Sequence, residues 1–334
     1  MKLAKYNLKA YFSLSGIRLI SDLLCFDMGG RTEMSLMAKM INLGVKMSGM
    51  KKKYSLPEEQ FLAEVRKMNR SRGFYMPKDH KAIYKKHIVL GRECLIVQKE
   101  EKRSEKAILY FFGGGMMIGP DKGDVDVIVK LAHKTNSDVW FPMYPLCIDH
   151  CITDAYEMAY ECYRQLIDLY GAGNVSTCGF SSGGALAIGI AAYNNTMKEK
   201  LPMPRHIVAV SPGEVPWNDA ERAIMQANNP KDMMVDYAFM EKVEKYEKQG
   251  RDDIPEFMIH ISKGDLRRVD HIHFVYSTDE VLYGAKQNFI DACKKYGVKY
   301  SVRERPGMIH CYAMLPYFRE SKEDFDEIAR ILAK

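Results

Sequence analysis

Residues 174–191 of the chain read NVSTCGFSSGGALAIGIA. The apolar and β-branched residues of 175–180 predict a short strand, and the small residues that follow predict a helix. Between them Gly179, Ser181 and Gly183 form G-x-S-x-G, the pattern of a nucleophile elbow. A serine in so sharp a turn projects its hydroxyl out of the sheet, and the flanking glycines remove Cβ atoms that would clash. The stretch therefore predicts that Ser181 is a nucleophile.

The sequence around this stretch alternates between strand and helix patterns. Residues 107–112 are a continuous apolar run, which is typical of a strand buried on both faces. Further short apolar strands are expected in the segments 139–143, 207–210, 272–276 and 300–303, with amphipathic helices between them. This alternation predicts an α/β protein with a mostly parallel central sheet and helices on both faces.

Two segments interrupt the alternation. Residues 1–80 are helical in pattern and rich in methionine, and residues 213–255 form a polar, helical insertion. We therefore expect an N-terminal helical cap region over 1–80 and a catalytic domain over 81–334, with 213–255 contributing to the cap. The methionines could fill a core or form a mobile apolar wall over a pocket, and the sequence leaves both readings open.

Composition excludes several classes of function. The net charge of +6 comes from lysines and arginines that are scattered among acidic residues, so no nucleic-acid surface is indicated. The eight cysteines form no C-x-x-C pair, which indicates free thiols in a reducing compartment and no zinc site. The N-terminus has neither the pattern of a signal peptide nor that of a membrane span, so we expect a cytoplasmic protein without stable membrane association.

A serine nucleophile needs a base, an acid that orients the base, and donors for an oxyanion. His310 lies in a loop after the strand at 300–303, where a base could reach the serine. Asp279 and Glu280 both follow the strand at 272–276, and residue chemistry alone does not separate them as the acid. The glycines at 113–115 follow a buried strand and could let backbone N–H groups approach a substrate oxygen.

With these motifs in order, the chain from about residue 107 onward resembles the hormone-sensitive-lipase-like branch of the α/β-hydrolases, which comprises bacterial esterases and lipases. FGGGM at 112–116 is similar to the family's H-G-G-G-[FW], and YPLCID at 144–149 to Y-R-L-A-P-E. GFSSGG at 179–184 resembles G-D-S-A-G-G, and PGMIH at 306–310 resembles P-G-M-x-H. The resemblance implies an α/β-hydrolase fold with a helical cap.

The resemblance also favours one acid over the other. In the family the acid is commonly the aspartate of D-P-L, with leucine two residues further on. Counting back from Leu282 gives Glu280 as the acid and leaves Asp279 as the alternative. The interval from Glu280 to His310 matches the family's usual spacing as well.

By the same matching, the oxyanion donors are the N–H groups of Gly114, Gly115 and Ser182. The chain departs from the family at Phe112, which stands where the motif has a histidine that organises the oxyanion loop. The loss of this histidine bears on the geometry of the loop and on the rate, while the backbone donors themselves remain.

The resemblance implies a serine carboxylesterase that hydrolyses short- to medium-chain esters through an acyl-enzyme, with no cofactor and no metal. Its partner would be a small-molecule ester substrate, and the sequence leaves room for a homodimer. One alternative is a non-catalytic member of the fold that binds a small molecule, and Phe112 in place of the motif histidine is the observation that suggests it. The other is an amidase or peptidase with the same triad.

Overall fold

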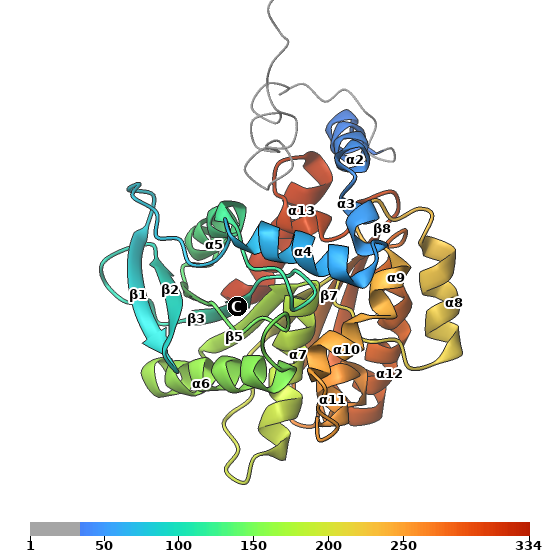
Figure 1. The fold of residues 1–334 in the computed structure, drawn as a ribbon. Coiled ribbons are helices and arrows are strands. Elements are labelled where there is room, and N and C mark those ends of the chain that lie inside the picture. Colours follow the sequence, from blue (N-terminus) through green and yellow to red (C-terminus); the bar gives the residue numbers. More distant parts are fainter. Residues whose placement is uncertain (1–33) are drawn as a thin grey trace, which may run out of the picture.

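The computed structural model of the chain describes residues 34–334. The described residues form an eight-stranded sheet in the order β1-β2-β4-β3-β5-β6-β7-β8 (Figure 1). The strands are β1 (Ile83–Val89), β2 (Arg92–Gln98), β3 (Ala107–Phe111), β4 (Asp138–Pro142), β5 (Val175–Phe180), β6 (Ile207–Val210), β7 (His271–Ser277) and β8 (Lys299–Arg305).

Only the first two strands break the parallel arrangement of the described sheet. β1 pairs antiparallel with β2, and β2 pairs antiparallel with β4, whereas the pairs from β4 to β8 are all parallel. Every residue of β3 and β4 is buried, as the continuous apolar runs predict. Because β3, β5, β6, β7 and β8 run in the same direction, the loops that follow them meet at one edge of the sheet.

Helices cover both faces of this sheet (Figure 1). On one face α5 (Lys122–Thr135) packs against α13 (Arg319–Ala333). On the other face α6 (Ile152–Tyr170) and α7 (Ser182–Thr196) pack against each other and against the central strands, with α12 (Lys286–Tyr296) beside β8. α7 is apolar or small on nearly every side and is almost completely buried, which fits its position directly behind β5.

Most of the remaining α-helices lie in the two segments that interrupt the alternation. The first segment contains α2 (Leu36–Ser48), α3 (Met50–Tyr54) and α4 (Glu58–Asn69), and the second contains α8 (Asp219–Asn228), α9 (Tyr237–Met240) and α10 (Val243–Lys248). α11 (Glu256–Ile259) follows the second segment. The two segments are far apart in sequence, but aromatic side chains bring α3 and α4 of the first into contact with α9 and α10 of the second. The ring centroids of Tyr54 and Phe239 are 5.1 Å apart, and those of Phe61 and Tyr246 are 5.9 Å apart. The part of the predicted cap before residue 34 lies outside the described residues.

Candidate active site

Ser181 occupies the turn between β5 and α7, where the sequence predicts an elbow. Its backbone has φ 53° and ψ −130°, a conformation that costs a non-glycine residue free energy. The neighbouring glycines are sterically required. A Cβ at Gly179 would lie 2.3 Å from the carbonyl oxygen of Gly183, and a Cβ at Gly183 would lie 2.2 Å from that of Phe112. Strand β5 can therefore approach β3 and α7 closely enough to hold the turn, which leaves the Ser181 hydroxyl facing the cavity described below.

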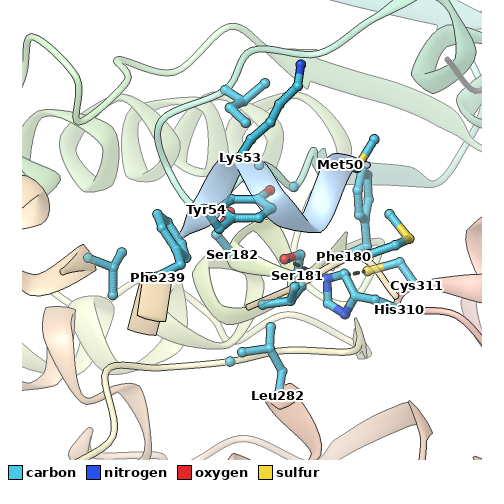
Figure 2. Close-up of a pocket in the computed structure, with 18 of the residues that line it drawn as sticks. Met50, Lys53, Tyr54, Phe180, Ser181, Ser182, Phe239, Leu282, His310 and Cys311 are labelled. Atoms are coloured by element: carbon cyan, nitrogen blue, oxygen red, sulfur yellow. Dashed lines mark hydrogen bonds between the residues drawn. The ribbon is translucent and has the colours of Figure 1, made fainter. Parts of the chain in front are cut away.

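The structure brings His310 and Glu280 to this serine. The Nε2 atom of His310 is 3.0 Å from Ser181 Oγ, and its Nδ1 atom is 2.5 Å from Glu280 Oε2 (Figure 2 shows the serine and the histidine). Glu280 is completely buried, and its other oxygen accepts a hydrogen bond from the Ser277 N–H at 2.9 Å. With Nδ1–H donating to the carboxylate, Nε2 is left to accept the serine proton.

Burial and charge act in opposite directions on this pair. Burial raises the pKa of Glu280, and the hydrogen bond from His310 partly offsets that effect. Burial lowers the pKa of His310, but its contacts with Cys311 and Glu280 raise it, and the net direction is upward. The arrangement therefore favours the imidazolium form that arises when His310 takes a proton.

The alternative acid, Asp279, is engaged elsewhere. Its Oδ2 atom accepts a hydrogen bond from the Gly307 N–H at 2.8 Å, and its Oδ1 atom is 3.7 Å from Lys231 Nζ. Asp279 thus ties the loop after β7 to the loop that carries His310, whereas Glu280 contacts the imidazole itself.

The glycine loop after β3 adopts backbone conformations that favour glycine. Gly114 has φ 122° and Gly115 has φ 59°; a Cβ on Gly114 would lie 2.3 Å from the Ile118 carbonyl oxygen. The N–H of Met116 donates to Ser182 Oγ at 3.1 Å, which ties this loop to the start of α7. The N–H groups of Gly114 and Gly115 donate to no backbone or side-chain acceptor within residues 34–334.

Phe112 begins this loop and packs against Tyr144. The two rings are stacked, and the Tyr144 hydroxyl donates to the Phe112 carbonyl oxygen at 2.7 Å. Both residues are buried. The first residue of the glycine loop is thus held through its ring and its backbone, although it is not the histidine of the motif.

A cavity of about 230 Å³ opens over Ser181 and His310. Its walls are mostly apolar and come from the loops of the sheet edge and from α3, α4, α9 and α10. Tyr54 and Phe239 project toward the serine in Figure 2. The sequence did not identify these wall residues, because they reach the site only through tertiary packing of two distant segments.

A second feature escaped the sequence analysis although it is next to a predicted residue. The Sγ atom of Cys311 lies 3.1 Å from Nε2 of His310, on the same nitrogen that faces Ser181 (Figure 2). The sequence shows only that Cys311 follows His310 directly. The approach of its sulfur to the imidazole depends on its backbone conformation, with φ 59°, which is rare for a residue other than glycine.

Comparison with known proteins agrees with this geometry. A family model described as the alpha/beta hydrolase fold matches residues 108–314. The chain therefore belongs to the α/β-hydrolase fold family, and the predicted fold class is confirmed. No curated protein sequence matches the chain.

Several solved structures share the fold. One is EstE5 soaked with ethyl alcohol, with a TM-score of 0.75, 19% identity, and coverage of 88% of this chain and 97% of the other. Another is an esterase from the bacterial hormone-sensitive lipase family, with a TM-score of 0.72, 19% identity and the same two coverages. A third is a hormone-sensitive lipase from a metagenome library, with a TM-score of 0.72, 18% identity and the same two coverages.

None of the helices within residues 34–334 is long and apolar enough to span a membrane.

Proposed function

We propose that the chain is a serine carboxylesterase of the hormone-sensitive-lipase-like type. The observation that carries the proposal is the relay of contacts from Ser181 Oγ through His310 to Glu280, at 3.0 and 2.5 Å. Hydrolysis of carboxylic esters is also consistent with the structurally similar proteins, of which one is an esterase and another a hormone-sensitive lipase.

In the proposed reaction, His310 takes the proton of Ser181 while Oγ attacks the ester carbonyl carbon. Glu280 holds the imidazole in the tautomer with Nδ1–H and stabilises the imidazolium. The N–H groups of Gly114, Gly115 and Ser182 would stabilise the tetrahedral oxyanion. His310 then gives its proton to the leaving alcohol, and water hydrolyses the acyl-enzyme by the same steps in the second half of the reaction.

The size and lining of the cavity support small apolar substrates. A volume of about 230 Å³ is below the range of about 300–1,000 Å³ usual for drug-sized ligands, so short- to medium-chain esters fit best. The walls contributed by α3, α4, α9 and α10 support a cap made of residues 1–80 and 213–255 over a catalytic domain of residues 81–334.

The test is hydrolysis of p-nitrophenyl esters from acetate to decanoate by the wild type, Ser181→Ala and Ser176→Ala. Ser176 is a matched control, since it is a buried serine on β5, the strand that leads to Ser181, and it does not line the cavity. We expect Ser181→Ala to lose activity by a factor of about 10³ or more, and Ser176→Ala to retain it. Activity that survives in Ser181→Ala would contradict the assignment of the nucleophile.

Labelling with a fluorophosphonate separates the enzyme from a protein that only binds a ligand. An activated serine reacts with this reagent, so we expect the wild type to be labelled and Ser181→Ala to be unlabelled. Labelling without ester hydrolysis would favour the amidase or peptidase alternative, which a series of matched p-nitroanilides then tests.

A further inference from the structure

Cys311 has a sulfur atom beside the proposed catalytic base that the reaction as written does not use. The residue is buried, lines the cavity, and has φ 59° and ψ 24°. Its N–H donates to Ser211 Oγ at 3.1 Å, which fixes the backbone at this point. The strained conformation directs the side chain to His310, with Sγ at 3.1 Å from Nε2 (Figure 2).

The Nε2 atom of His310 therefore has two neighbours at almost equal distance, Ser181 Oγ at 3.0 Å and Cys311 Sγ at 3.1 Å. In the neutral imidazole Nε2 is an acceptor, and the serine hydroxyl can donate to it. Once the proton has moved, Nε2–H becomes a donor, while Oγ has become bonded to the acyl carbon. The sulfur lone pair is then an acceptor at the correct distance for the same N–H.

We propose that Cys311 is a positioning residue, whose sulfur accepts a hydrogen bond from Nε2–H of the protonated His310 and so holds the imidazolium between proton acceptance and proton delivery. The inference rests on the proposed esterase function and adds a group to its mechanism. No bond to sulfur forms or breaks in this step. The proton stays on Nε2 until the leaving alcohol takes it.

The charged and titratable groups around the pair agree with this role. Glu280 faces the Nδ1 side of the imidazole, and Asp232 lies behind Glu280, where it accepts from the Val281 N–H at 2.8 Å. Tyrosines approach from α3, β3 and the turn after His310, and burial raises the pKa of each of them, so they are neutral near pH 7. These tyrosines are Tyr54, Tyr110 and Tyr312.

The direction of the shifts supports a stabilised imidazolium. Burial alone would lower the pKa of His310, but its contacts with Glu280 and with the Cys311 sulfur raise it well above its ordinary value, while burial raises the pKa of the Cys311 thiol itself. Removing the sulfur should therefore lower the pKa of His310. Since the base must be neutral to accept a proton, the acid limb of the activity profile should move to lower pH.

The experiment compares kcat and kcat/KM for p-nitrophenyl acetate between pH 5 and 9 in the wild type, Cys311→Ala, Cys311→Gly and Cys151→Ala. Cys151 is the matched control, because both cysteines are 6% exposed and Cys151 does not line the cavity. Cys311→Gly suits the positive φ, so it keeps the test informative even if Cys311→Ala folds poorly.

We expect kcat at the optimum to fall about tenfold in both Cys311 variants, with KM nearly unchanged, and the acid limb to move down by about 1 pH unit. Cys151→Ala should give the wild-type profile. A profile of Cys311→Gly that superimposes on that of the wild type would overturn the proposal. The wild type and Ser181→Ala in the same assay separate this failure from a failure of the proposed function, which would appear as a wild type that does not hydrolyse the ester or as activity that survives in Ser181→Ala.

Methyl methanethiosulfonate provides a second measurement, in which the sulfur of Cys311 is modified chemically instead of being removed. The thiolate of Cys311 would attack the reagent's sulfur, forming a methyl disulfide and releasing methanesulfinate. The added methylthio group occupies the space beside Nε2 and displaces the sulfur from its contact with the imidazole, so we expect inactivation of the wild type and Cys151→Ala, reversal by dithiothreitol, and resistance of Cys311→Gly. Equal inactivation of Cys311→Gly would contradict the assignment.

Discussion

The rings of Phe112 and Tyr144 are stacked, with centroids 4.1 Å apart and planes inclined by 5°. The same tyrosine donates its hydroxyl to the Phe112 carbonyl oxygen at 2.7 Å. A residue that departs from the family motif is thereby fixed by one that the motif retains. The contact anchors the start of the glycine loop, whose N–H groups are the proposed oxyanion donors.

Replacing Tyr144 by Phe keeps the stacked ring and removes the hydroxyl that holds the loop. The Phe112 carbonyl oxygen would lose its partner in a buried place, which costs about 1–3 kcal/mol of the free energy of unfolding. We expect kcat for p-nitrophenyl butyrate to fall about tenfold with little change in KM, because the loop acts in the transition state.

Tyr163→Phe is the control for this change. Tyr163 is buried and donates to the Pro202 carbonyl oxygen at the same 2.7 Å, but it lies outside the cavity. Both variants should have a lower Tm than the wild type, whereas only Tyr144→Phe should have a lower kcat. Equal kcat values in the two variants would show that the hydroxyl does not position the loop.

The two neighbouring acids should differ sharply in kinetics. Glu280→Gln preserves the shape of the side chain but removes the charge that stabilises the His310 imidazolium, so kcat should fall by about 10²–10⁴. Asp279→Asn keeps an oxygen that can accept from the Gly307 N–H, and its kcat should stay within about threefold of the wild type. Stopped-time assays at pH 7 are sufficient to separate them. The reverse order of effects would make Asp279 the acid.

Glu221 should make the free energy of unfolding fall as pH rises from 5 to 8. Burial and the charge of Glu214 raise the pKa of Glu221 to about 8 in the folded protein, above its ordinary value of 4.5. Folding therefore favours the protonated carboxyl. Its contribution to stability is complete below the unfolded pKa and is lost as pH rises toward 8. Glu221→Gln should raise Tm relative to the wild type progressively between pH 5 and 8.

The exposed Glu59 provides the comparison, and Glu59→Gln should leave the dependence of Tm on pH unchanged. A Tm difference between Glu221→Gln and the wild type that is constant from pH 5 to 8 would mean that Glu221 does not change its protonation on folding.

Phe239 should limit the length of the substrate. Its ring lines the cavity and lies against Gly115, where an added Cβ would be 2.5 Å from the ring. Phe239→Ala should enlarge the cavity and move the optimum of the p-nitrophenyl ester series to longer acyl chains, at a cost of about 3–5 kcal/mol in stability. Phe289→Ala removes another buried ring, which lies outside the cavity. It should lower Tm without moving the optimum, and a shift of the optimum in both variants would refute the assignment.

The fold was predictable because its signals are local. The apolar run of β3 and the glycines around Ser181 determine the backbone wherever they occur, and their order along the chain specifies a parallel sheet. The position of His310 after the last strand followed from the same order. Residue chemistry did not decide between Asp279 and Glu280, and only the family resemblance favoured Glu280. Adjacent residues differ in where their carboxylates point, and that depends on contacts with Gly307 and Ser277.

The cavity was not predictable for a different reason. Its wall joins Tyr54 to Phe239, two residues that neither hydrophobic periodicity nor a motif connects. Cys311 was hidden in another way. Its sequence position was known, but the approach of its sulfur to Nε2 depends on a left-handed backbone that is rare for cysteine.

The aromatic contacts between α3, α4, α9 and α10 have a consequence for the evolution of this protein. None of Ser181, Glu280 and His310 lies on these four helices. Under the proposed function, substitutions there would alter which ester fits without disturbing the proposed reacting atoms, so selection could act on substrate range and on chemistry separately. The two halves of the wall touch, however, so a new ring in one half requires a matching change in the other. We expect substrate range in descendants of this chain to shift through paired substitutions rather than single ones.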